Sequence, residues 1–236
     1  MKKMLLINVS PRTKGTSFTM LQMCKKYLEG RGYQTELFHL YQNLTHMNKL
    51  ITAAADADTI IISGPCYINT YPADTIALLK ELLTYKEMLQ GKSLYGIIQG
   101  GMPYAHTHES GLSLLDIFCK KCGMFFKGGF VMGMGAYLDG KPLTKLPNGK
   151  KVIRQLNIFF QHMEKDEISP PEVYRKAQFK LPGIFFKVMV KKMNQNIDRD
   201  LQSHGIDVNQ RNPYLTSYFA DKQREEAVPL SKQTFL

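Results

Sequence analysis

A short loop near the start of the chain carries residue types that bind phosphate groups. It runs from Ser10 to Ser17 and reads SPRTKGTS. The apolar run Met4–Val9 before it is typical of a buried strand, and apolar side chains recur at helical spacing after it. The first N–H groups of a helix lack partners within the helix and lie at the positive end of its dipole. Such a turn therefore suits an anion.

The side chains of this loop favour the same chemistry. The loop offers hydroxyl donors, a glycine that allows close approach and two cations: Ser10, Thr16, Ser17, Gly15, Arg12 and Lys14. A plainer interpretation is an ordinary capped helix, with Thr16 or Ser17 as the N-cap. The loop by itself leaves both interpretations open.

The kind of phosphate compound is narrowed by signatures that the loop lacks. It has neither the G-x-x-x-x-G-K-[ST] pattern of nucleotide triphosphatases nor the G-x-G-x-x-G pattern of dinucleotide sites. No acidic residue precedes Glu29, which removes the aspartates that a receiver domain needs after its first strand. A hydroxyl-rich loop of this kind fits a terminal phosphomonoester, and FMN is the leading candidate.

Two more loops each follow a predicted buried strand. These strands span residues 58–64 and 93–98. Gly64–Pro72 is stiffened by its prolines, and Gln99–Tyr104 contains paired glycines that allow a ligand close to the backbone. The residues that could border a flat heteroaromatic ring are Pro65, Cys66, Tyr67, Ile68, Asn69, Gly100, Gly101 and Tyr104. A plain proline turn that covers apolar surface is the alternative for the first of the two loops.

Metal and thiol chemistry have weaker support. His106 and His108 form an H-x-H pair without a third ligand, so a hydrogen-bonded loop histidine is the simpler interpretation. Cys119 and Cys122 form a C-x-x-C pair, but they continue a helical stripe that starts at Leu112, so both thiols are expected in the core. No second Cys/His pair lies at zinc spacing. We therefore expect no metal site.

These loops need a scaffold, and the hydrophobic pattern predicts a doubly wound α/β fold. Strands and helices alternate five times, which indicates a parallel sheet with right-handed crossovers. The predicted strands are 4–9, 34–40, 58–64, 93–98 and 125–132, and the helices that follow them begin near residues 16, 46, 73, 109 and 150. In such a sheet ligands bind at the carboxyl ends of the strands, where the three loops lie.

Composition sets limits on the class of protein. The 236 residues are 44% hydrophobic, their formal net charge is +11, and no apolar run approaches the roughly 20 residues of a membrane span. The apolar stretch that follows Lys2 and Lys3 is too short for a signal peptide. Four cysteines make no disulfide scaffold, so a reducing cytoplasm is expected. Aromatic residues are not interleaved with the lysines, so we expect no nucleic-acid partner.

A boundary is expected at the proline-containing stretch around residue 169. It divides the chain into a first domain of residues 1–168 and a basic, helical C-terminal extension of residues 169–236. In the extension, Phe186, Val190 and Met193 have helical spacing on one face. Such a helix suits a membrane surface, or it packs on its own domain or on a second copy. No stable membrane insertion is expected.

The three loops together resemble the NADPH-dependent FMN reductase family of flavodoxin-like proteins, over roughly residues 3–165. The matching patterns are S-P-R-x-x-G-T-S from Ser10, P-x-Y-x-N from Pro65 and the pair Gly100-Gly101. The resemblance implies a flavodoxin-like, doubly wound, five-stranded parallel sheet of strand order 2-1-3-4-5. It also implies that the first loop binds the FMN phosphate and that the other two border the isoalloxazine ring.

By this resemblance the chain is an oxidoreductase whose chemistry belongs to FMN, with no catalytic side chain required. NADPH or NADH would reduce the flavin, and a quinone, azo compound, nitroaromatic, ferric chelate or free flavin would reoxidise it. We expect a homodimer. The alternatives are a flavodoxin-type electron carrier, although such carriers are usually acidic, and a flavin-free scaffold whose basic tail contacts a membrane or partner.

Overall fold

The computed structural model describes residues 2–179 and 183–208. Contacts between residues divide the chain into two units, Met1–Lys180 and Leu181–Leu236. The first unit contains a sheet of five parallel strands in the order β2-β1-β3-β4-β5, as predicted. The strands are β1 Lys3–Asn8, β2 Gln34–His39, β3 Thr59–Pro65, β4 Ser93–Gln99 and β5 Phe125–Met132.

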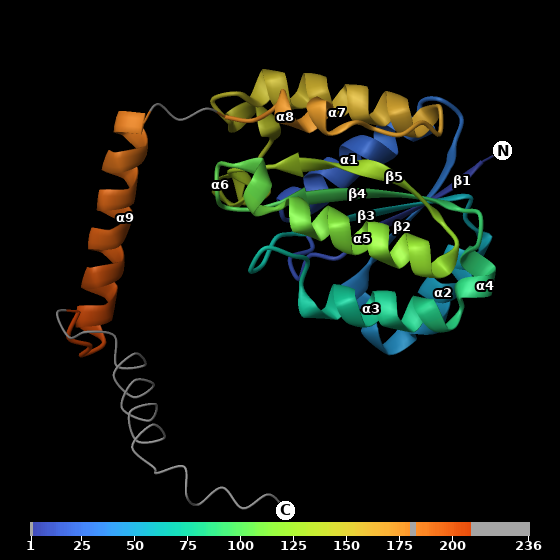
Figure 1. Cartoon of the computed structure of the whole chain (residues 1–236), viewed down its shortest axis with the longest axis horizontal. Helices are drawn as coiled ribbons and strands as arrows, with labels where there is room; N and C mark the ends of the chain where they lie inside the picture. The colour runs from blue at the N-terminus through green and yellow to red at the C-terminus, as the bar shows by residue number, and fades with distance from the viewer. Residues whose placement is uncertain (1, 180–182, 209–236) are drawn as a thin grey trace, which may run out of the picture. The chain divides into compact units, whose positions relative to one another are not determined.

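The main helices connect consecutive strands and cover both faces of the sheet (Figure 1). The helices that cover the sheet, with the short elements between them, are α1 Thr16–Glu29, η1 Leu40–Gln42, η2 Leu44–His46, α2 Met47–Asp56, α3 Ala73–Thr84, α4 Lys86–Leu89, η3 Ala105–Thr107, α5 Glu109–Cys122, α6 Gly135–Leu138, η4 Leu143–Lys145, α7 Gly149–Glu164 and α8 Pro171–Arg175. Helices α1 and α7 lie on one face, and α2, α3 and α5 lie on the other. This is the doubly wound arrangement that the alternating pattern predicts.

Burial follows the sequence pattern of each strand. All residues of β3 and β4 are buried, because helices cover both faces of these central strands. Strand β2 lies at an edge and is only partly buried, in agreement with its alternating sequence. In α5, the stripe that ends in Cys119 and Cys122 is buried as expected, and all four cysteines are free thiols.

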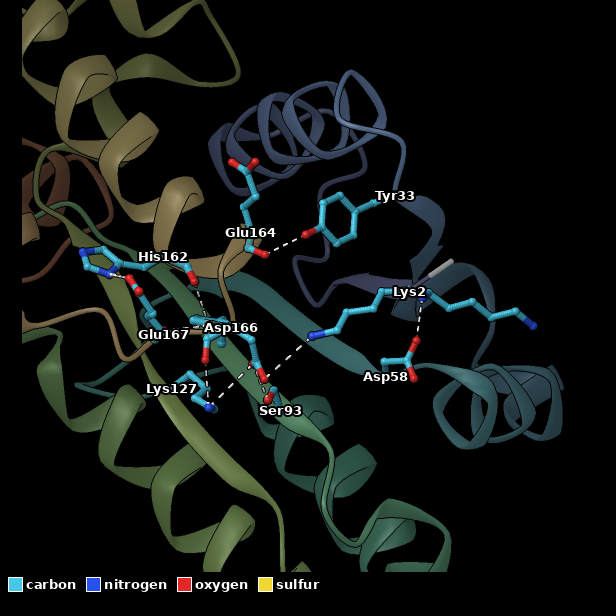
Figure 2. A network of polar contacts seen from close by, with 11 residues as sticks. Lys2, Tyr33, Asp58, Ser93, Lys127, His162, Glu164, Asp166 and Glu167 are labelled. Atoms are coloured by element: carbon cyan, nitrogen blue, oxygen red, sulfur yellow. Dashed lines mark hydrogen bonds and ion pairs between the residues drawn. The ribbon is translucent and has the colours of Figure 1, made fainter.

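Polar contacts fasten the end of the sheet that lies opposite the three loops (Figure 2). Ser93 at the start of β4 donates a hydrogen bond of 2.6 Å to the Asp166 carboxylate, and Lys127 Nζ donates to the Asp166 carbonyl oxygen at 2.9 Å. The Tyr33 hydroxyl donates to the Glu164 carbonyl oxygen at 2.6 Å. These contacts join the end of α7 to β4, β5 and the start of β2, so the strand starts are held in register.

The first unit continues past the boundary that the sequence suggests at residues 168/169. Ser169 donates a backbone hydrogen bond of 2.8 Å to Lys127 and forms a bridge with Gly128 of β5. Val173, Tyr174 and Ala177 are buried. Because these contacts extend the core, residues 169–179 belong with the sheet, and the contact boundary falls between Lys180 and Leu181.

The described part of the second unit is one helix, α9 Gly183–Ser203. Four apolar side chains on it are more than half exposed: Ile184, Val188, Met193 and Ile197. The expected apolar face also included Phe186, whose side chain lies outside the described residues. Across the residues that the structure describes, every helix is too short or too polar to cross a membrane.

Candidate functional site

A cleft of about 170 Å³ opens at the carboxyl ends of β1, β3 and β4. It is lined by Ser10, Arg12, Gly15, Thr16, Pro65, Cys66, Tyr67, Gln99, Gly100, Gly101, Gly135, Ala136 and Asp139. All three loops singled out from the sequence contribute to it. Of the predicted site residues, only Ser17, Ile68, Asn69 and Tyr104 are not part of this lining.

The first loop is shaped from within by the buried side chain of Asn8. Its Oδ1 accepts a hydrogen bond from the Ser10 N–H at 3.3 Å, and its Nδ2 donates to the Arg12 carbonyl oxygen at 3.5 Å. The Ser10 hydroxyl in turn accepts from the Arg12 N–H at 3.1 Å. The Asn8 amide nitrogen also lies 2.9 Å from His39 Nδ1 on β2. Asn8 therefore organises the loop, a role that sequence reasoning missed.

Helix α1 begins at Thr16 without a side-chain cap. Its N-cap residue is Gly15, and no side chain accepts a capping hydrogen bond from the first N–H groups. The alternative that Thr16 or Ser17 caps the helix is therefore wrong, since both residues lie inside the first turn. Gly15 and Thr16 line the cleft, so the N-terminus of α1 borders it, and a helix N-terminus favours an anion.

The hydroxyls of the first turn bind other parts of the protein. Thr16 Oγ1 donates to the Gly135 carbonyl oxygen at 2.8 Å and lies 3.4 Å from the Gly140 N–H. Ser17 is buried, and its hydroxyl accepts from Gln99 Nε2 at 3.3 Å. The Thr16 hydroxyl therefore donates within the protein, and Ser17 is held by Gln99 outside the cleft lining.

The second loop is a tight turn that exposes an aromatic and an apolar side chain. Tyr67 and Thr70 exchange backbone hydrogen bonds of 2.7 and 3.2 Å, with Ile68 and Asn69 at positive φ between them. The Tyr67 side chain is half exposed, and Ile68 is almost fully exposed. The Cys66 N–H donates to Gln99 O at 2.6 Å, which ties this loop to the third one.

The third loop rests on the ring of His108. A Cβ at Gly100 would lie 2.3 Å from His108 Cε1, so only glycine fits. His108 is buried, and its Nε2 lies 3.2 Å from the Met102 carbonyl oxygen. This is the hydrogen-bonded loop histidine that the sequence suggests. Tyr104 stacks on the His106 ring, with centroids 5.7 Å apart, and stands outside the lining of the cleft.

A fourth segment, Gly133–Gly140 after β5, completes the cleft and was not predicted. The Gly135 N–H donates to Gly100 O at 2.8 Å. A Cβ at Gly140 would lie 2.0 Å from Lys14 O, so this segment packs directly on the first loop. Its one sequence signal is the glycine repetition in VMGMGAYLDG at a strand end, which is the signal used for the third loop.

Gln99 is a further residue of the site to which the sequence reasoning gave no role. Its side chain is 7% exposed and lines the cleft. Its Nε2 donates to Ser17, but the buried Oε1 has no hydrogen-bond partner. A buried acceptor without a donor is costly. This oxygen lies against Gly135, where a Cβ would come within 2.0 Å of it, so the Gln99 side chain packs on the fourth segment.

The charges and titrating groups of the cleft set its chemistry. The Arg12 guanidinium forms an ion pair with the Asp139 carboxylate, and both side chains are mainly exposed. Burial raises the pKa of the Cys66 thiol, so this cysteine is not an activated nucleophile. Burial also lowers the pKa of His108. Among the described residues, no three His, Cys, Asp or Glu side chains cluster as metal ligands.

Comparison with known proteins gives one family and a set of similar folds. The model of the family described as NADPH-dependent FMN reductase matches residues 2–137. No curated protein sequence is significantly similar to this chain.

Similar solved structures include an apo NADH:FMN oxidoreductase, with 20% identity, a TM-score of 0.58, and coverage of 74% of this chain and 94% of that one. An FMN-dependent NADH-azoreductase from Bacillus anthracis in complex with FMN has 14% identity, a TM-score of 0.54, and coverage of 70% and 99%. An NADPH-quinone reductase from P. pentosaceus has 14% identity, a TM-score of 0.51, and coverage of 69% and 97%. At these identities the likeness concerns the fold.

Proposed function

The chain belongs to the family of NADPH-dependent FMN reductases, and we propose that the cleft at the carboxyl ends of β1, β3 and β4 is where it holds FMN. The observation that carries this proposal is the convergence of three loops, predicted independently from the sequence, on one cleft. FMN would take a hydride from NAD(P)H and pass electrons to an acceptor. The protein's own task is then to bind and orient the flavin.

The FMN phosphate would lie at the first loop. The uncapped start of α1 supplies backbone N–H donors, Gly15 lets the phosphate approach, and Arg12 supplies positive charge. The Ser10 hydroxyl, which lines the cleft, can add one donor. Thr16 contributes through its backbone, since its hydroxyl donates to Gly135 O, and Ser17 is buried and not part of the cleft lining.

The ribityl chain and the ring would follow the cleft away from α1. The backbone of Pro65, Cys66 and Gly100-Gly101 would then border the ring. Tyr67 and Ile68 are exposed beside it, so nicotinamide and then a small planar acceptor can reach one ring face.

The acceptor is a small molecule in this proposal. Quinones, azo compounds, nitroaromatics, ferric chelates and free flavin share a need for an open ring face rather than for a dedicated pocket. An electron carrier that docks on redox proteins is a weaker candidate, because carriers of that kind are usually acidic and this chain has a net charge of +11. We also expect the protein to act as a homodimer, which its molar mass in solution would test.

The test is the visible spectrum of the purified protein, recorded after FMN is added and after anaerobic addition of NADPH. We expect bound FMN and its rapid bleaching by NADPH or NADH without another protein. Bleaching that requires a separate reductase would identify a carrier. A protein that takes up no FMN at millimolar concentration would refute the proposal.

A further inference from the structure

We infer that Asp139 competes with the FMN phosphate for Arg12 and thereby limits how tightly the cleft holds FMN. The inference rests on the proposed function. It concerns a residue that no sequence pattern singled out, in the segment that follows β5.

The starting observation is a carboxylate in the wall of a site built for an anion. Asp139 lines the same cleft as Ser10, Gly15 and Thr16, and it forms an ion pair with Arg12. Arg12 is the one cation among the residues that line the described cleft. The positive charge available for a phosphate is therefore already shared with a carboxylate of the protein.

The backbone holds this carboxylate near the first loop. The next residue, Gly140, packs on Lys14 O and hydrogen-bonds with Thr16 through its N–H. Lys141 N–H donates to Leu138 O at 2.8 Å, which closes a turn around Asp139. Asp139 itself has φ +48°. Because both flanks are anchored, Asp139 cannot leave the cleft when a phosphate arrives, although its side chain can rotate.

The consequence for binding has two parts. The phosphate must displace Asp139 from Arg12, and it then shares the cleft with a negative charge. Both side chains are exposed by more than half, so solvent screens both effects. We therefore expect that Asp139 weakens FMN affinity only three- to tenfold. This ratio of dissociation constants corresponds to a difference in binding free energy on the order of 1 kcal/mol.

The test is a titration of FMN into the full-length protein and into the variant Asp139→Asn. Binding is monitored by the quenching of flavin fluorescence. Asparagine tolerates the positive φ at this position, so the turn is kept. We expect Asp139→Asn to bind FMN about three to ten times more tightly at low salt, with a smaller gain at high salt. Riboflavin, which lacks the phosphate, should bind both proteins equally.

A matched control changes the net charge equally but outside the cleft. Asp116 on α5 pairs with Lys120 at 2.7 Å, and Asp116→Asn should leave FMN affinity unchanged. An Asp139→Asn variant with unchanged FMN affinity would overturn the inference, and so would one with weaker affinity, because Asp139 would then orient Arg12 for the phosphate. If neither wild type nor any variant binds FMN, the proposed function itself fails.

Discussion

The contact between Thr16 and the segment after β5 yields a prediction whose magnitude follows from the structure. Thr16→Val keeps the side-chain shape and removes the hydroxyl that donates to Gly135 O at 2.8 Å. Thr16 and Gly135 are both buried, so the variant leaves a carbonyl oxygen of a buried residue without its side-chain donor. Such a loss costs about 1–3 kcal/mol. The longer contact with Gly140 N–H, at 3.4 Å, adds little.

The measurement is the free energy of unfolding from urea denaturation, with the thermal midpoint as a second readout. In a protein of this size each kcal/mol lowers Tm by about 2–4 °C. Thr52→Val is the matched control: Thr52 is exposed on α2, and its hydroxyl contacts only the Asn48 carbonyl oxygen of its own helix, at 3.0 Å. If Thr16→Val costs no more than Thr52→Val, the hydroxyl does not join the two loops and the reasoning fails.

Three further predictions concern the third loop and the cysteines. Gly100→Ala should destabilise the protein by about 1–3 kcal/mol, because its Cβ would meet the buried His108 ring at 2.3 Å. Gly101→Ala, whose Cβ would meet only Ala136 at 3.6 Å, is the control for stability and should leave the free energy of unfolding nearly unchanged. Burial lowers the pKa of His108 below its ordinary value of about 6.5, so the unfolded chain binds the extra proton first, and stability should fall as pH decreases below about 6.5. His108→Gln should reduce that slope in urea titrations between pH 7 and pH 5, and an unchanged slope would contradict the assignment. Burial raises the pKa of Cys66 and Cys122, and that of Cys119 to about 12, but only Cys66 of these three is partly exposed. Iodoacetamide should therefore modify Cys66 first, as peptide mass spectrometry would show, and equal rates would mean that the thiols of α5 are accessible.

Much of the fold could be predicted because its signals are local. The predicted strand 125–132 and helix 109–122 coincide with β5 and α5. The helical spacing of Val152, Leu156 and Phe159 predicts one buried stripe, and all three are buried on α7. In α3 the sequence spacing of Ile76, Leu79 and Leu83 predicts one buried stripe, but the buried leucines are Leu78, Leu79 and Leu82, so the buried face is rotated. The helix was identified correctly, but a mainly apolar sequence does not define which face meets the sheet.

The C-terminal side of the first unit was harder to predict. Pro170 and Pro171 suggest a linker, yet α8 and the residues around it pack on β5. Proline restricts the backbone locally, but it carries no information about what the next turn contacts. The extent of the core here depends on the contact between Ser169 and Gly128, which lie far apart in sequence.

The sequence by itself determined the strand and helix pattern, the family and the three loops that meet at the cleft. Hydrophobic periodicity, glycine and proline determine the backbone structure within a few residues. A parallel sheet then brings the carboxyl ends of its strands to one edge. Only the tertiary structure decided that Thr16 and Ser17 turn their hydroxyls to the protein, and that Asp139 reaches Arg12. Strands β3 and β4 lie between β1 and β5, so the contact between Arg12 and Asp139 joins loops that follow two non-adjacent strands. No local pattern encodes a contact between segments so far apart, because it depends on how every intervening element packs.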